Sequence, residues 1–290
     1  MIEFPFNPVA FQIGPFSLRY YGLFLALSVV WLIGWMWWQV RKKGAKLSLD
    51  TVLTLALVGI PSGVIFARLI HVVDNIVVAK THPELVLSGA VIDYSQDWAS
   101  VIGGSGLTAW GAVLGASLGI WTYCKFSKIK IGYVFDLLAP GVIIAQAIGR
   151  FGCLFNGCCY GVETSVPWGL VYTHPDTLAP LGITTHATVA YEIFFNLAVF
   201  GILMKLRGKL QPTGSLFVLY LAFYAAWRVG IDFLRSGTPF FLGLHQAQFI
   251  GMVILLIAVP WMAIKTRWTR PEETASLIEN INSGPTTPSA

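Results

Sequence analysis

Four polar side chains recur at helical spacing in the last third of the sequence. They are Tyr224, Arg228, Asp232 and Arg235. Separations of four, four and three residues place them on one face of a helix. A charged group inside an apolar segment costs free energy unless it faces a bundle interior or water, so it is a candidate functional group. Arg228 and Asp232 could merely neutralise each other, but Arg235 adds a positive charge that such a pair does not need.

A glycine-rich segment carries a second set of candidate groups. Residues 149–161 read GRFGCLFNGCCYG, and Arg150 and Asn156 in this segment are hydrogen-bond donors. Glycine lets the backbone turn and approach a ligand closely. Arginines on two helices, here Arg150 and Arg228, match the geometry of a phosphate group. Phospholipid headgroups are the abundant phosphates of a membrane, so the pattern predicts a phospholipid site.

Composition identifies the elements that must position these groups. Of the 290 residues, 56% are hydrophobic and 11% are charged, whereas soluble domains carry about 25% charged residues. Membrane lipid must therefore cover much of the surface. The net charge of +5 is spread over short clusters between apolar runs, which argues against nucleic acid as a partner.

Seven apolar segments have the length of a membrane-spanning helix, which is about 20 residues. They cover residues 19–40, 51–73, 102–124, 132–151, 187–204, 213–235 and 244–264. Asp136, Pro140 and Gln146 interrupt the fourth. The sequence therefore predicts an all-α integral membrane protein with about seven transmembrane helices. In the third segment, Gly111, Gly115 and Gly119 recur every four residues, which favours close packing against another helix.

Basic residues set the expected orientation. They follow the first, third, fifth and seventh segments in clusters of four, three, three and three. The positive-inside rule makes that side cytoplasmic, with the N-terminus outside and the C-terminus inside. Arg68, Arg150, Arg228 and Arg235 lie within segments or at their outer ends. They face either the bundle interior or, by snorkelling, the outer interface.

The chain ends fall outside the predicted membrane region. The first eighteen residues contain no Lys or Arg, so we expect no cleavable signal peptide. Residues 1–17 are expected to form an interfacial segment and residues 18–266 the membrane domain. The polar residues 267–290 are expected to form a disordered cytoplasmic tail.

Three of the four cysteines, Cys153, Cys158 and Cys159, fall on the predicted outer side, where disulfides persist. The sequence leaves two alternatives open: a Cys153–Cys158 or Cys153–Cys159 disulfide, or three cysteines without a disulfide. We expect no metal site, because no histidine lies close in sequence and the spacing matches no zinc pattern.

Residues 1–266 resemble the bacterial prolipoprotein diacylglyceryl transferases. The family motif G-R-x-G-N-x-x-N-G-E-x-x-G is similar to residues 149–161, with matches at Gly149, Arg150, Gly152, Asn156, Gly157 and Gly161. Cys153 and Cys158 replace its first Asn and its Glu. A second motif, Y-x-x-x-R-x-x-x-E-F-x-R, matches from Tyr224 to Arg235, with Asp232 in place of Glu.

Shorter matches complete the resemblance, and one departs from the family. Tyr21 falls on a functional tyrosine, Gln248 on a glutamine of the last span, and His186 with Tyr191-Glu192 on H-P-x-x-x-Y-E. The family's H-G-G-L appears as Trp110-Gly111-Ala112-Val113, so tryptophan replaces a catalytic histidine. The chain therefore resembles a divergent branch of the family.

The resemblance implies an enzyme that needs no cofactor or metal. It would transfer the diacylglyceryl group of phosphatidylglycerol to the lipobox cysteine thiol of an exported prolipoprotein signal peptide, in the inner (plasma) membrane of a bacterium. Arg150 and Arg228 are the expected phosphate clamp, and Tyr21 and Asn156 would orient the headgroup. The expected substrate-binding residues are Arg68, Trp110, Gly111, Gly152, Gly157, Gly161, Tyr224, Asp232, Arg235 and Gln248.

The replaced histidine leaves alternatives open. His186 or His71 could accept the thiol proton, or His186 could be a structural residue at a helix start. The chain could also be a non-catalytic or altered-substrate relative that binds phospholipid or lipoprotein signal segments. Thiol-redox chemistry at the three neighbouring cysteines is a third possibility.

Overall fold

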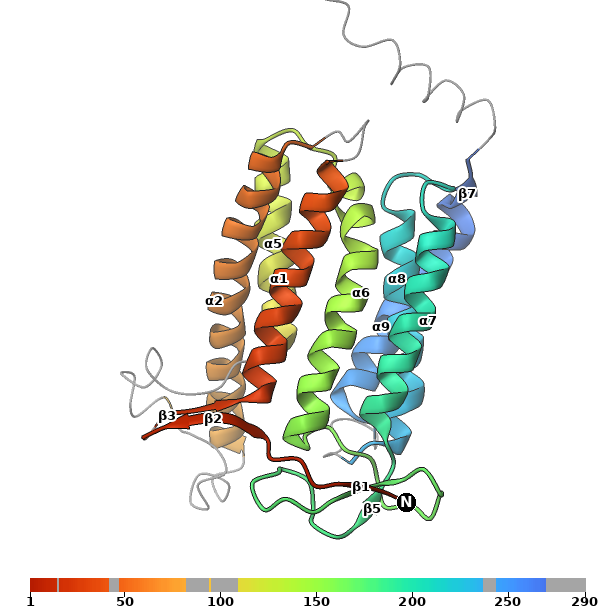
Figure 1. Ribbon diagram of the computed structural model, residues 1–290. Helices are drawn as coiled ribbons and strands as arrows, with labels where there is room; N and C mark the ends of the chain where they lie inside the picture. The colour runs from red at the N-terminus through yellow and green to blue at the C-terminus, as the bar shows by residue number, and fades with distance from the viewer. Residues whose placement is uncertain (15, 42–46, 82–93, 95–108, 237–243, 270–290) are drawn as a thin grey trace, which may run out of the picture. The chain divides into compact units, whose positions relative to one another are not determined.

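The computed structural model describes residues 1–14, 16–41, 47–81, 94, 109–236 and 244–269. Within these residues the chain forms seven α-helices, one 3-10 turn and seven short β-strands (Figure 1). It divides into two compact units, one made of Met1–Gly44 with Gly132–Ala290 and the other of Ala45–Ile131. Each unit is described by itself.

The larger unit contains five α-helices. They are α1 (Tyr20–Val40), α6 (Ile131–Asn156), α7 (Thr188–Leu206), α8 (Ser215–Ile231) and α9 (Gln246–Lys265), and the 3-10 turn η1 (Asp232–Leu234) follows α8. The smaller unit contains α2 (Leu49–Thr81) and α5 (Ala109–Phe126).

Six helices of the described chain, all except α5, are long and apolar enough to cross a membrane. This confirms a multi-pass, all-α membrane protein. A helix also forms at the third predicted segment, but α5 begins only at Ala109. Residues 102–108 lie outside the described residues, as does most of the expected C-terminal tail. The predicted orientation stays a prediction.

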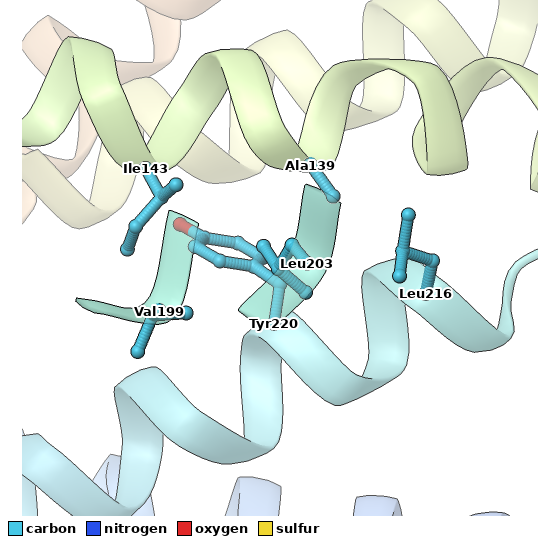
Figure 2. Packing of buried hydrophobic residues seen from close by; sticks show 6 residues of the cluster. All are labelled: Ala139, Ile143, Val199, Leu203, Leu216 and Tyr220. Atoms are coloured by element: carbon cyan, nitrogen blue, oxygen red, sulfur yellow. The ribbon is translucent and has the colours of Figure 1, made fainter. Parts of the chain in front are cut away.

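The core of the larger unit lies where α6, α7 and α8 meet. Its buried members are Ala139, Ile143, Val199, Leu203, Leu216 and Tyr220. Figure 2 shows Tyr220 extending from α8 toward Ile143 on α6. Burying these side chains fixes three helices relative to one another, and two of the three, α6 and α8, carry candidate arginines near their ends.

The carboxylate of Asp136, on α6, caps the N-terminus of α8. The Asp136 oxygens accept hydrogen bonds from the backbone N–H groups of Gly214, at 2.7 Å, and Phe217, at 3.0 Å. A helix N-terminus leaves such donors without intrahelical partners and favours negative charge. Asp136 therefore interrupts its apolar segment for a structural reason.

Pro140 leaves α6 helical, and α1 packs beside it. The indole Nε1 of Trp35 donates to the Leu137 carbonyl at 2.9 Å, and that of Trp31 donates to the Gly141 carbonyl at 3.2 Å. A Cβ on Gly141 would collide with the Trp35 ring. Glycine therefore allows α1 to contact α6 directly.

Seven short strands, which were not predicted from the sequence, pair segments near the first and last described residues with loops or with each other. Strand β1 (Ile2–Phe4) pairs in parallel with β4 (Leu170–Tyr172), and β4 pairs antiparallel with β5 (Thr184–Thr185). Strands β2 (Val9–Ile13) and β3 (Phe16–Arg19) form a hairpin before α1. Strand β6 (Leu210–Gln211) pairs with β7 (Arg267–Trp268). The expected interfacial segment therefore contains regular backbone pairing.

The smaller unit confirms the predicted glycine packing. A Cβ on Gly111 would lie 2.5 Å from the Phe66 carbonyl oxygen, and Cβ atoms on Gly115 and Gly119 would collide with Ser62. These three glycines of α5 thus let α2 approach at backbone distance.

Candidate active site

Five charged side chains form a continuous chain of ion pairs in the larger unit. Arg150 Nε lies 2.9 Å from Glu192 Oε1, whose partner oxygen Oε2 lies 4.0 Å from Arg228 Nη1. Arg228 Nη2 lies 2.9 Å from Asp232 Oδ1, and Arg235 Nε lies 3.8 Å from the same oxygen. The network therefore joins α6, α7, α8 and η1. Figure 1 shows that α6 and α8 end where α7 begins, at one end of the bundle.

The network is buried and carries an excess of positive charge. The side chains of Glu192 and Asp232 are each 3% exposed, and those of the three arginines are 12–18% exposed. Among the described residues, three guanidinium groups face two carboxylates in this network, which gives it one positive charge in excess. An uncompensated buried charge is costly. The site is therefore suited to one bound anion.

Arg228 and Asp232 do more than neutralise each other. Glu192 also faces Arg228, and Arg235 shares the Asp232 carboxylate. One turn earlier on α8, Tyr224 lies close to Arg150 and Glu192.

Tyr224 and Arg228 lie on α8 as predicted. However, α8 ends at Ile231, so Asp232 begins the 3-10 turn and Arg235 follows it in extended backbone. The predicted single helical face is therefore shorter than expected, although its side chains still meet α6 and α7 as one polar cluster.

Arg19 and Glu192 are site residues that the predicted site did not include. Arg19 Nη1 donates to Asn156 Oδ1 at 2.9 Å and so connects the start of α1 to the end of α6. Glu192 lies on the first turns of α7 between two arginines. The rule that flags intramembrane arginines applies equally to Glu192, so the signal was present in the sequence.

Glycines allow the surrounding segments to pack closely around the site. A Cβ on Gly152 would lie 3.1 Å from the Tyr21 Cα, and one on Gly161 would lie 2.5 Å from the His186 Cβ. Gly157 has φ +67°, and a Cβ there would collide with Thr177. These close approaches place Tyr21 near Arg150 and the three cysteines.

Three cysteine thiols lie beside Arg150. The Sγ atoms of Cys153, Cys158 and Cys159 all lie within 4.8 Å of one another, and all three residues are free thiols. Arg150 Nη1 lies 3.8 Å from the Cys153 sulfur and 3.7 Å from that of Cys159. Neither expected disulfide is formed in the structure, and the bridge stays a prediction. Hydrogen bonds from the two other thiols, together with nearby Arg235 and Arg150, hold the pKa of Cys159 well below its usual range.

Other predicted residues take positions whose substrate roles stay predictions. His186 contributes its backbone to the site loop, because its carbonyl accepts from Gly161 N–H at 3.1 Å, and its ring packs against Tyr191. Gln248 Nε2 donates to the Val229 carbonyl at 3.2 Å and Oε1 accepts from His245 N–H, so its amide links α8 to the start of α9.

Arg68, Trp110 and Gly111 belong to the smaller unit. The Arg68 guanidinium lies 5.2 Å from the centre of the Tyr94 ring, and Trp110 is in the first turn of α5. Their expected contribution to the site also stays a prediction.

Comparison with known proteins shows the family of this chain. The family model for prolipoprotein diacylglyceryl transferase matches residues 8–264. The chain belongs to this family. A protein named phosphatidylglycerol–prolipoprotein diacylglyceryl transferase from Dehalococcoides mccartyi is 42% identical over 92% of this chain and 96% of its own length. Proteins of the same name from Bifidobacterium adolescentis and Clostridium tetani are 31% and 28% identical, over 86% and 87% of this chain and 75% and 95% of their own lengths.

Proposed function

We propose that this chain transfers the diacylglyceryl group of phosphatidylglycerol to a cysteine thiol. The acceptor is the lipobox cysteine in the signal peptide of an exported prolipoprotein, and the reaction takes place in the inner (plasma) membrane of a bacterium. Family membership supports the reaction class. The observation that carries the proposal is the buried ion-pair network with one positive charge in excess.

The charge of the network matches the donor lipid. The phosphodiester of phosphatidylglycerol carries one negative charge, and breaking its C–O bond leaves glycerol phosphate with a second one. Arg150 and Arg228 therefore bind the phosphate more strongly as the reaction proceeds, which is how a fixed charge lowers a barrier. The two side chains are 18% and 12% exposed, and the buried Arg228 Nη1 has no hydrogen-bond partner among the described residues, so this donor is left for a bound phosphate.

The other site residues orient these groups. Glu192 lies between the two clamp arginines and faces Nη1 of Arg228, whereas Asp232 pairs with Nη2 of the same arginine. Each carboxylate restricts the rotation of a guanidinium, which keeps the clamp preorganised for the phosphate. Tyr21, which lies near Arg150, and Asn156 would orient the glycerol hydroxyls of the headgroup.

A transfer assay tests the proposal. Purified protein in detergent would be incubated with phosphatidylglycerol and a lipobox peptide. Mass spectrometry would then measure the mass added to the peptide cysteine. Arg150→Ala is expected to lower the rate by roughly a hundredfold or more, as the loss of one charge-stabilising donor does. Arg41→Ala is the matched control, because Arg41 is exposed and stacks on Trp37 at the end of α1. Full activity of Arg150→Ala would overturn the clamp.

Trp110 favours one alternative within the family. Trp110 replaces a histidine to which the resemblance assigns a catalytic role. The chain could therefore bind lipid or signal segments without transferring the diacylglyceryl group. The same assay separates the two functions. A peptide that binds but gains no diacylglyceryl mass would favour the binding role.

A further inference from the structure

Three thiols from one short segment meet at a single point beside the ion-pair network. Cys153 lies in the last turns of α6, and Cys158 and Cys159 follow the helix end. All three sulfurs lie within 4.8 Å of one another. We propose that Cys153, Cys158 and Cys159 together bind one Zn²⁺ ion and leave its fourth coordination position open to an external thiol.

The backbone holds the three thiols in place. Gly157 ends α6 with φ +67°, and Cys158 N–H donates to the Cys153 carbonyl at 3.2 Å. Cys159 itself has φ +63°, an unusual value for a residue with a side chain. Its carbonyl accepts a hydrogen bond from Thr188 Oγ1 at 2.8 Å. These contacts make neighbouring residues present their sulfurs to the same point, which the sequence spacing alone did not predict.

The separation of the sulfurs suits a metal ion better than a disulfide. Zinc–sulfur bonds of about 2.3 Å in a tetrahedral site put neighbouring sulfurs about 3.8 Å apart. A disulfide needs about 2.05 Å and joins only two of the three atoms. Three sulfurs that all lie within 4.8 Å of one another can reach one common ion, and none of the three thiols is then left over.

The charges around the cluster also fit. Three thiolates around a dication carry one net negative charge, which would share the positive charge of Arg150 with the phosphate of the donor lipid. Arg150 Nη1 lies 3.8 Å and 3.7 Å from two of the sulfurs, so it can donate N–H···S hydrogen bonds to them. Outer hydrogen bonds of this kind orient the ligands of a metal ion and tune its chemistry. Arg150 is held in turn by Glu192 at 2.9 Å.

An open fourth position has a direct chemical use, and this step rests on the proposed transferase function. A thiol that coordinates zinc loses its proton, which leaves to solvent, and stays bound as thiolate. The sulfur then attacks the glyceryl carbon of the donor lipid and forms the new C–S bond. The C–O bond to phosphate breaks, and glycerol phosphate leaves with the bonding electrons. Thiol activation by this site would need no histidine at the position of Trp110.

Metal binding is measured first, independently of transfer. Full-length protein in detergent is reduced, stripped with a chelator and titrated with Zn²⁺ against a competing indicator. A parallel titration with Cd²⁺ follows thiolate-to-metal charge transfer in the ultraviolet. We expect one ion per chain, and we expect Cys153→Ser, Cys158→Ser and Cys159→Ser each to weaken binding by at least about a hundredfold. Cys124→Ser is the matched control, because Cys124 is a buried thiol on α5 and its loss should leave binding unchanged.

The outcomes separate the metal site from the reaction. No stoichiometric Zn²⁺ binding, or binding that all three serine variants retain, would overturn the site. Binding that the variants lose, in a protein that transfers no diacylglyceryl group, would uphold the site and count against the proposed function. Transfer at the full rate by the stripped enzyme, with metal restoring nothing, would overturn thiol activation.

Discussion

Arg150 on α6 and Glu192 on α7 form an ion pair with 2.9 Å between Nε and Oε1. Glu192 also faces Arg228 on α8 at 4.0 Å. One carboxylate therefore holds two arginines that come from different helices. Its position makes Glu192 the residue on which the geometry of the proposed clamp depends most.

Glu192→Gln should damage both stability and transfer. The substitution keeps the shape of the side chain but leaves two buried arginines facing a neutral group. Breaking a buried ion pair costs about 3 kcal/mol or more, so we expect a lower melting temperature in detergent and a transfer rate reduced at least tenfold. Glu163→Gln, in the exposed loop after α6, should change neither. Wild-type behaviour of Glu192→Gln in both measurements would contradict the assigned role.

Asp232 is expected to act by positioning arginines. It lies 2.9 Å from Arg228 Nη2 and 3.8 Å from Arg235 Nε. Asp232→Asn removes the charge that orients both, and we expect the KM for phosphatidylglycerol to rise by roughly tenfold, the equivalent of about 1.4 kcal/mol. Asp232→Glu restores the charge and should recover most of the affinity. A purely structural role would instead lower the melting temperature and leave the KM unchanged.

Asp136 should matter for stability and not for substrate. It accepts two backbone N–H groups at the start of α8, and it precedes Arg150 on α6 by a distance of about 20 Å. Asp136→Ala should cost about 1–2 kcal/mol, as the loss of a helix cap does, with an unchanged KM in the folded fraction. Asp50→Ala, in the exposed first turn of α2, is the comparison and should have a smaller effect on thermal unfolding.

Two glycines near the site should respond oppositely to alanine. Gly157 has φ +67° and would collide with Thr177, whereas a Cβ on Gly149 meets nothing within 4 Å. Gly157→Ala should destabilise the protein by more than about 1 kcal/mol. Gly149→Ala, inside α6, should be neutral or stabilising by up to about 1 kcal/mol. Equal melting temperatures for the two variants would show that the turn at residue 157 tolerates a side chain.

The helices were predictable because their signal is local. Each of the seven predicted apolar segments contains a helix within its described residues, and Asp136 and Pro140 did not prevent α6 from forming. The strands were missed because β1 and β4 have three residues each and pair across more than 160 positions of sequence. Two short runs without alternating polarity carry no strand signal that can be read along the chain.

The site was predictable in its arginines but not in the contacts between them. Spacing placed Tyr224, Arg228 and Asp232 on one face of a helix, and the structure joins that face to Arg150 through Glu192. Which carboxylate bridges which arginines depends on how α6, α7 and α8 pack, and that packing is set by apolar residues far from the charges. The convergence of the three thiols depends on the backbone angles of Gly157 and Cys159, which residue types alone do not determine.

The parallel pairing of β1 with β4 fixes the order in which this end of the molecule is completed. Ile2–Phe4 are synthesised before their partners Leu170–Tyr172, which follow α6 in the chain. The opening strand must therefore stay unpaired while the helices between them are made. It also has to reach the same side of the membrane as the loop between α6 and α7. A bulky fusion at Met1 would consequently hinder the pairing of β1 with β4, and with it the folding of the loop that carries the glycines and cysteines.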